Sequence, residues 1–209
     1  MSTYLFDFDG TLVDSMPSWA TQLLGILDKY NVSYPDDIIK TVTPLGNTET
    51  MEYFIDMGLP LSVDEGLKLV HERLIPCYAD FIPAKSGVVA TLRELKKRGH
   101  SLNILTASPH VFLTPCLTRL GIYDCFDNIW SSDDFQFVKS QPEIYKEAAK
   151  RLGVDVSDII FLDDNYIADC AAKKAGTMVY GVYDLSSDDM VDKIKEATDR
   201  YIFDFKELL

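Results

Sequence analysis

The sequence predicts an α/β protein: a Rossmann-like parallel sheet core with helices on both faces, into which an all-helical domain is inserted. From residue 84 onward, short apolar strands alternate with helices that stop at glycines, which is typical of right-handed crossovers between parallel strands. No strand pattern interrupts residues 15–83. We therefore expect an α/β core formed by residues 1–14 and 84–209 and a helical domain formed by residues 15–83.

The first predicted strand is the short apolar run at residues 4–6, which leads into a turn at Gly10. Helices of the inserted domain are expected at residues 17–30, 36–42, 48–57 and 62–81. In the first of these, apolar residues recur at helical spacing and Pro17 suits the first turn. Ser62 and Glu65 form the pattern of a capping box at the start of the last.

The elements of the expected core follow in regular alternation. Strands are predicted at residues 101–105, 128–131, 159–162 and 178–182, where apolar residues predominate. Helices are predicted at residues 87–98, 109–120, 142–152 and 167–175. A glycine directly follows each of these helices, as expected for the residue that ends a helix.

The composition excludes several classes of protein. Hydrophobic residues make up 47% of the chain and charged residues 25%, which are ordinary values for a globular protein. The formal net charge of −13 disfavours nucleic acid or an anionic membrane as a partner, because both carry negative charge. A small phosphorylated metabolite remains a suitable partner, since local cationic groups and a metal ion can reverse the sign of the charge at one site.

Cysteine usage and the N-terminus indicate a cytoplasmic protein. The four cysteines form no C-x-x-C pair and have no histidine at metal-ligand spacing, so we expect buried, reduced thiols rather than a zinc site. No apolar stretch reaches the ~18 residues needed to span a bilayer. The first residues contain neither the basic start nor the apolar run of a signal peptide.

Polar side chains follow three of the predicted strands. They are Asp7 and Asp9, Thr106 and Ser108, and Asp163 and Asp164. In an open parallel sheet, ligands bind at the carboxyl ends of the strands, so these side chains are expected to share one site. A turn alone explains Asp9-Gly10 equally well, but crowded carboxylates repel one another unless a cation lies among them. Oxygen ligands of this kind suit Mg²⁺.

These residues resemble the four motifs of the haloacid dehalogenase superfamily, in its metal-dependent phosphatase branch of phosphoglycolate phosphatase and β-phosphoglucomutase-like enzymes. Residues 7–15, Asp-Phe-Asp-Gly-Thr-Leu-Val-Asp-Ser, are similar to its first motif. Thr106 occupies the place of the second, and Lys139 that of the third, although a proline often follows that lysine directly. Residues 161–164, with Asp169 further on, are similar to the fourth. The resemblance covers nearly the whole chain and is specific for fold and chemistry, but says little about substrate.

The resemblance and the chemistry imply the same catalytic roles. Asp7 would attack phosphorus and form an aspartyl-phosphate intermediate. Asp9 would protonate the leaving oxygen and later deprotonate the attacking water. Thr106 would donate a hydrogen bond to the phosphoryl group, and Lys139 would neutralise charge on its oxygens.

The resemblance also implies the metal ligands. Mg²⁺ would be held by the side chains of Asp7 and Asp164 and by the backbone carbonyl of Asp9. Asp163 and Asp169 would be either further ligands or groups that orient the ligands. The residues expected to contact the phosphate are Phe8, Gly10, Thr106, Ala107 and Lys139.

Simpler interpretations remain open for several of these residues. Lys139 taken alone would be a solvated lysine, but its place before a helix that begins with a proline favours the functional role. Thr106 taken alone would merely end a strand, and Asp169 would be a surface carboxylate. His110 would either lie near the phosphate or be an exposed residue in the first turn of its helix. Trp19 is expected to pack within the helical domain rather than stack on substrate.

The resemblance implies that the helical domain is a cap that closes over the site and selects the substrate. Candidate selecting residues are Ser15, Met16, Asn47 and Thr48. A structural role is the favoured interpretation for the last two, either of which could cap the helix that begins there.

Three other functions can be weighed against a phosphatase. A phosphomutase of the β-phosphoglucomutase type would have a histidine soon after the first motif, where Trp19 stands, and an arginine in the early cap, where none precedes Arg73. A dehalogenase would need neither Asp9 nor Thr11. A catalytically silent binding module would be expected to have lost one of the motif residues, and none is missing. Sugar phosphates, phosphoglycolate and nucleotides all remain possible substrates.

Overall fold

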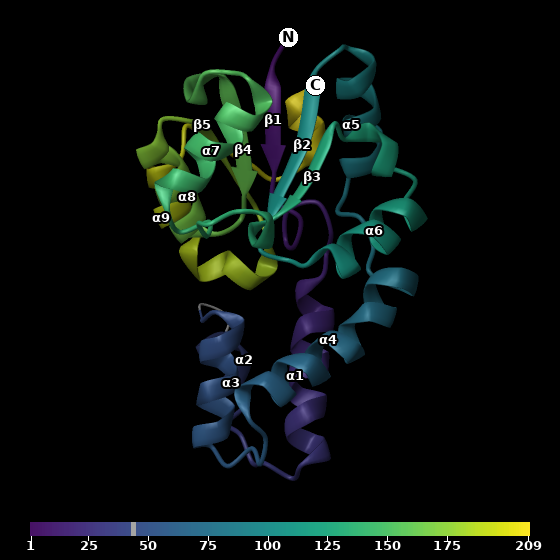
Figure 1. Ribbon diagram of the computed structural model, residues 1–209, viewed down its shortest axis with the longest axis vertical. Coiled ribbons are helices and arrows are strands. Elements are labelled where there is room, and N and C mark those ends of the chain that lie inside the picture. The colour runs from purple at the N-terminus through teal and green to yellow at the C-terminus, as the bar shows by residue number, and fades with distance from the viewer. Residues whose placement is uncertain (43–44) are drawn as a thin grey trace. The chain divides into compact units, whose positions relative to one another are not determined.

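The computed structural model describes residues 1–42 and 45–209, and the chain divides into two compact units. One unit comprises residues 1–14 and 83–209, and the other comprises residues 15–82 (Figure 1). Of the helices in the described residues, none is long and apolar enough to cross a membrane.

The first unit is built on a six-stranded sheet in which every strand is parallel to its neighbours. The strands are β1 (Thr3–Phe6), β2 (Ser101–Thr106), β3 (Asn128–Ser131), β4 (Ile159–Asp163), β5 (Met178–Val182) and β6 (Arg200–Ile202). Their order is β3-β2-β1-β4-β5-β6, so the direction of sheet growth reverses at β1. This arrangement confirms the predicted parallel α/β core.

Helices cover both faces of this sheet (Figure 1). They are α5 (Val88–Lys97), α6 (His110–Arg119), α7 (Pro142–Leu152), α8 (Tyr166–Ala175) and α9 (Val191–Ala197). Successive side chains of a strand point to opposite faces. Leu5 accordingly belongs to the core beneath α7 and α8, whereas Phe6 stacks on Phe205 in the 3₁₀ helix that packs against α5.

The sequence pattern located these elements to within about two residues at most ends, and helix ends themselves vary by that much. Gly153 and Gly176, which end α7 and α8, have φ angles of 69° and 104°. The pattern missed α9 and β6, because elements of seven and three residues are too short to show a periodic signal.

The second unit consists of α1 (Met16–Lys29), α2 (Ile38–Val42), α3 (Asn47–Asp56) and α4 (Val63–Asp80), with no strand among its described residues. The predicted capping box is present, since Ser62 and Glu65 exchange hydrogen bonds at the start of α4. Trp19 joins α1 to α4, because its Nε1 donates a hydrogen bond to the Tyr78 hydroxyl at 2.8 Å. The prediction that Asn47 or Thr48 caps α3 is wrong: the N-cap residue is Gly46, which has no side chain, and Asn47 is the first residue of the helix itself.

Candidate active site

The candidate site lies where the strand order reverses. In open sheets with this order, ligands bind outside the carboxyl ends of the strands at the reversal. Asp7 directly follows β1, and its backbone N–H donates to the Leu162 carbonyl of β4 at 2.8 Å. Thr106 ends β2 and Asp163 ends β4. Parallel pairing of β1 with both neighbours therefore brings residues from distant parts of the sequence to one edge.

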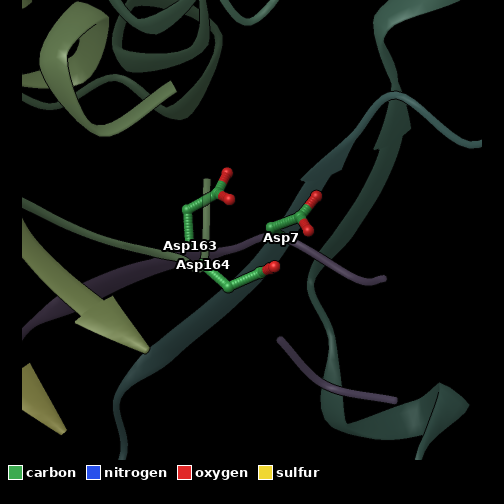
Figure 2. Close-up of side chains that lie close together, drawn as sticks. All are labelled: Asp7, Asp163 and Asp164. Carbon is green, nitrogen blue, oxygen red and sulfur yellow. The ribbon is translucent and has the colours of Figure 1, made fainter. Parts of the chain in front are cut away.

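Three carboxylates meet at this edge. Asp7, Asp163 and Asp164 each place one oxygen within 4.8 Å of the others, and all three side chains are buried (Figure 2). Of the other two predicted metal ligands, Asp9 and Asp169, neither carboxylate belongs to this group within the described part of the chain.

The electrostatics of this cluster favour a cation. Burial raises the pKa of Asp164 well above its usual value, and the charges of Asp163 and Asp7 raise it further. Burial also raises the pKa of Asp163, although Lys139 opposes this effect. A divalent cation would relieve the repulsion, and an all-oxygen donor set suits a hard ion such as Mg²⁺. The residues present therefore fit the cofactor that the sequence predicts.

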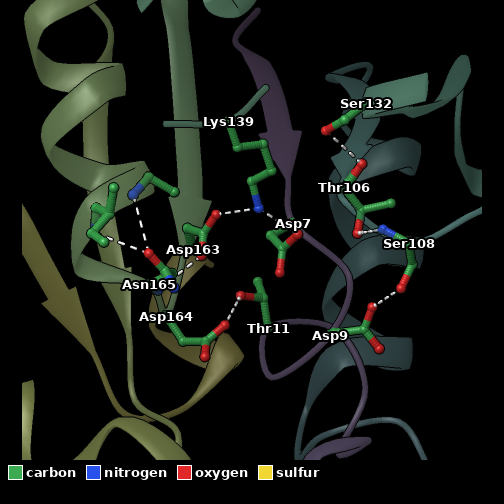
Figure 3. A network of polar contacts seen from close by, with 12 residues as sticks. Asp7, Asp9, Thr11, Thr106, Ser108, Ser132, Lys139, Asp163, Asp164 and Asn165 are labelled. Carbon is green, nitrogen blue, oxygen red and sulfur yellow. Dashed lines mark hydrogen bonds and ion pairs between the residues drawn. The ribbon is translucent and has the colours of Figure 1, made fainter. Parts of the chain in front are cut away.

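Lys139 provides the cationic side chain of the cluster. Its Nζ lies 2.6 Å from Oδ1 of Asp7 and 2.5 Å from Oδ2 of Asp163 (Figure 3). Burial alone lowers the pKa of Lys139, but the two carboxylates outweigh that effect and raise it, so the side chain stays charged. Its carbonyl accepts a hydrogen bond from the Tyr145 hydroxyl at 2.8 Å, which fixes the lysine backbone. The burial and ion pairs of Lys139 exclude the alternative of a solvated lysine.

Asp164 is positioned by the loop that follows β1. The Thr11 hydroxyl donates to Oδ1 of Asp164 at 2.9 Å (Figure 3). Gly10 has a φ angle of +74°, and a Cβ at this position would lie 2.5 Å from Oδ2 of Asp164. Both facts require glycine here. Its N–H donates to the Val13 carbonyl at 2.9 Å, so this group already has a partner within the loop.

The Asp9 carboxylate lies on the β2 side of the site. Oδ2 of Asp9 accepts a hydrogen bond from the Ser108 hydroxyl at 2.5 Å (Figure 3). The Ser108 N–H donates in turn to Oγ1 of Thr106 at 3.1 Å. The Thr106 carbonyl accepts from the Ser132 hydroxyl at 3.1 Å. Ser108 thus connects the predicted acid–base residue to the predicted phosphate-binding threonine.

The remaining predicted residues differ in their surroundings. Asp169, on α8, is completely buried, and neither carboxylate oxygen has a hydrogen-bond partner among the described residues, so its interpretation as a surface carboxylate is wrong. The Phe8 side chain is buried in the core, whereas Ala107 is exposed in the loop after β2. His110 is exposed and lies 2.8 Å from Asp134, so the simpler interpretation holds.

Sequence reasoning missed two supporting residues. Lys85 directs its ammonium to the carbonyls of Gly10 and Tyr183 and to the carboxylate of Asp184, and no local pattern marks it. Asn165 caps α8 by accepting hydrogen bonds from the N–H groups of the second and third helical residues, at 2.9 and 3.2 Å. An asparagine directly before an apolar helix was a usable signal for that cap.

Comparison with known proteins agrees with this geometry. A model of the haloacid dehalogenase-like hydrolase family matches residues 4–182. The chain is 31% identical over 191 residues to pyrophosphatase PpaX from Bacillus velezensis, covering 87% of this chain and 83% of that protein. It is 26% identical over 184 residues to a phosphorylated carbohydrates phosphatase from Thermotoga maritima, covering 87% and 85%. The crystal structure of CbbY from Rhodobacter sphaeroides with phosphate has the same fold, with a TM-score of 0.85 and 21% identity over 100% of this chain and 96% of that chain.

Proposed function

Because the chain belongs to the haloacid dehalogenase-like hydrolase family, we propose that it is a phosphatase that hydrolyses a small phosphomonoester through an aspartyl-phosphate on Asp7, with Mg²⁺ as its cofactor. One observation carries the proposal. The Asp7 carboxylate lies at the strand reversal, beside both the Lys139 ammonium and the carboxylates of Asp163 and Asp164. A nucleophile for an anionic phosphate needs this kind of charge neutralisation.

The proposed reaction has two steps. An Asp7 oxygen forms a bond to phosphorus while the ester P–O bond breaks, and Asp9 gives the departing oxygen a proton. Water then attacks the phosphorus of the aspartyl-phosphate and gives its proton to Asp9. The bond between phosphorus and Asp7 breaks, which releases phosphate and restores both carboxyl groups. Lys139 and Thr106 would stabilise the charge on the phosphoryl oxygens in both steps.

The hydrogen bonds and ion pairs of each carboxylate indicate its role at the proposed metal site. Asp7 and Asp164, with the backbone carbonyl of Asp9, would hold Mg²⁺. When bound, the ion neutralises charge on the phosphoryl group. Both oxygens of Asp163 have partners: Oδ1 accepts a hydrogen bond from the Asn165 N–H at 2.8 Å, and Oδ2 forms an ion pair with Lys139. We therefore assign Asp163 the role of orienting Lys139, and Asp169 that of a buried carboxyl group behind the cluster.

The helical unit is proposed to act as the cap. The chain enters it after Asp14 and leaves it before Pro83, and the Asp14 N–H donates to the Pro83 carbonyl at 3.0 Å. Val13 and Ala84 also pair at this point. Two adjacent connections of this kind would let one unit rotate as a body, excluding water when substrate is bound. Ser15, Met16, Asn47 and Thr48 remain the proposed selecting residues.

The proposed substrate is a small phosphorylated metabolite in the cytoplasm. The names of the two relatives refer to pyrophosphate and to phosphorylated carbohydrates, and both are small phosphorylated compounds. The net charge of −13 disfavours nucleic acid as a substrate.

Two measurements test the proposed function. The first is hydrolysis of p-nitrophenyl phosphate, pyrophosphate and a panel of sugar phosphates, with Mg²⁺ and with EDTA. The second is acid quenching with ³²P-labelled substrate, which should label the wild-type chain and leave the Asp7→Asn variant unlabelled. Full activity in EDTA would contradict the metal assignment, and equal labelling of both chains would contradict the nucleophile.

A further inference from the structure

Lys85 connects two loops that are far apart in the sequence. Its ammonium contacts the Gly10 carbonyl in the loop after β1. It also lies 2.5 Å from the Tyr183 carbonyl and 2.8 Å from Oδ2 of Asp184, both in the loop after β5. The Lys85 side chain is 17% exposed and that of Asp184 is 6% exposed. A largely buried lysine with three hydrogen-bond acceptors connects the two loops and is not a solvated surface charge.

The Asp184 carboxylate is held in place by further hydrogen bonds of its own. Oδ1 of Asp184 accepts hydrogen bonds from the N–H of Ser186 at 2.9 Å and from its hydroxyl at 2.7 Å. Oδ2 is therefore held in place for Lys85, and the pair resists rotation of either side chain.

Lys85 also holds the loop after β1, which supports the carboxylate cluster. The Lys85 backbone N–H donates to the Leu12 carbonyl at 3.0 Å, so the lysine contacts this loop through both its backbone and its side chain. Gly10 packs against Asp164, and the next residue, Thr11, donates to the Asp164 carboxylate. Asp9, whose carbonyl is the proposed backbone ligand of Mg²⁺, directly precedes Gly10.

We propose that Lys85 is a positioning residue for the metal centre, which fixes the loop that presents Thr11 to Asp164 and the Asp9 carbonyl to the ion. This inference rests on the proposed Mg²⁺ site. The direction of the change in Mg²⁺ affinity distinguishes a positioning role from a simple electrostatic effect of the lysine charge. A lysine near a metal site repels the ion, so loss of its charge alone would strengthen Mg²⁺ binding. Loss of a positioning contact weakens metal binding, typically by about 10–100-fold.

Isothermal titration calorimetry with MgCl₂ on the metal-free full chain tests this inference without measuring activity. The decisive variant is K85M/D184N, which removes both charges of the pair and so leaves the local net charge unchanged. It also leaves no buried charge without a partner, so the variant is expected to fold. A matched control is E94Q/R98M, which removes an exposed ion pair between α5 and the residue that directly follows it, in the same unit. Thermal unfolding confirms that each variant is folded.

We expect K85M/D184N to weaken Mg²⁺ binding by about tenfold or more, and the control to bind as the wild type does. The single variant K85M should also bind more weakly, despite the loss of a positive charge. Equal or tighter Mg²⁺ binding by the folded double variant would overturn the positioning role of Lys85 and leave the proposed Mg²⁺ site intact. A wild-type chain that binds no Mg²⁺ would overturn the proposed metal site and this inference together.

Discussion

The Ser108 hydroxyl donates a hydrogen bond to Oδ2 of Asp9, with the two oxygens 2.5 Å apart. Asp9 follows the first strand and Ser108 follows the second, so this contact spans the gap between two neighbouring strand ends. The Ser108 N–H is itself held by Oγ1 of Thr106 at 3.1 Å. The proposed acid–base group is therefore oriented by the same loop that supplies the proposed phosphate-binding threonine.

Replacement of this serine should slow the reaction without weakening substrate binding. In Ser108→Ala the Asp9 carboxyl loses the donor that orients it. A hydrogen bond to a charged group contributes about 1.5–3 kcal/mol, so we expect kcat to fall by about tenfold or more. KM should change little, and Ser108→Thr, which keeps the hydroxyl, should restore most of the loss. Steady-state kinetics measures both constants, and a change in KM alone would contradict the orienting role.

Gly10→Ala should destabilise the protein and weaken Mg²⁺ binding. The added Cβ would lie 2.5 Å from Asp164 Oδ2, and φ is +74°. The matched control is Gly153→Ala, where φ is +69° but no atom lies within 4 Å of the new Cβ. Both variants incur the cost of a left-handed alanine, roughly 1–2 kcal/mol. Only Gly10→Ala displaces a proposed ligand.

Thermal unfolding and calorimetry distinguish these two effects. Each kcal/mol lowers the Tm of a chain of this length by about 2–4 °C, so both variants should unfold earlier than wild type and Gly10→Ala earliest. Only Gly10→Ala should lose Mg²⁺ affinity. Wild-type affinity in Gly10→Ala would show that the loop adjusts without moving Asp164.

The strand-end residues were accessible from sequence because each follows a local apolar run. Asp7 and Asp163 could be assigned to one edge once parallel pairing was inferred. The contacts that support them were not accessible, since they depend on where distant loops meet. Lys85 lies 75 residues from Gly10 and 99 from Asp184, and no local pattern records such distances. The burial of Asp169 was hidden for the same reason: its surroundings come from other elements.

Buried carboxyl groups should make the metal-free protein more stable as the pH falls. Burial, with the charges of Asp163 and Asp164, raises the pKa of Asp169 well above its usual value. The folded state then binds more protons than the unfolded state between the usual and the raised pKa. This contribution to stability is complete below the unfolded pKa of about 4 and is lost as the pH rises through the raised pKa.

The measurement is Tm in EDTA across neutral and mildly acidic pH. Wild-type Tm should rise by several degrees as the pH falls from about 8 to about 5.5, and Asp169→Asn should reduce that slope by raising Tm at the upper end. Asp158→Asn, at an exposed position, is the control and should leave the slope unchanged. An Asp169→Asn slope equal to that of wild type would show that this carboxyl does not titrate as proposed.

Asp9 and Asp7 should be distinguishable by the leaving group of the substrate. If Asp9 protonates the leaving oxygen, Asp9→Asn should slow the hydrolysis of sugar phosphates far more than that of p-nitrophenyl phosphate. An alkoxide of high pKa needs a proton in the transition state, whereas p-nitrophenolate departs without one. General acid assistance contributes about 10²–10⁴-fold, so the two substrates should diverge by a readily measured ratio.

Asp7→Asn is the matched comparison, because neither substrate can react without the nucleophile and both rates should fall together. Mg²⁺ binding by Asp9→Asn should remain near that of wild type, since Asp9 is proposed to offer the ion only its backbone carbonyl and its carboxylate is bonded to Ser108 instead. Calorimetry on the metal-free variant tests that condition. Equal losses on both substrates, with Mg²⁺ affinity unchanged, would show that Asp9 is not the general acid and that its carboxylate serves another purpose at the site.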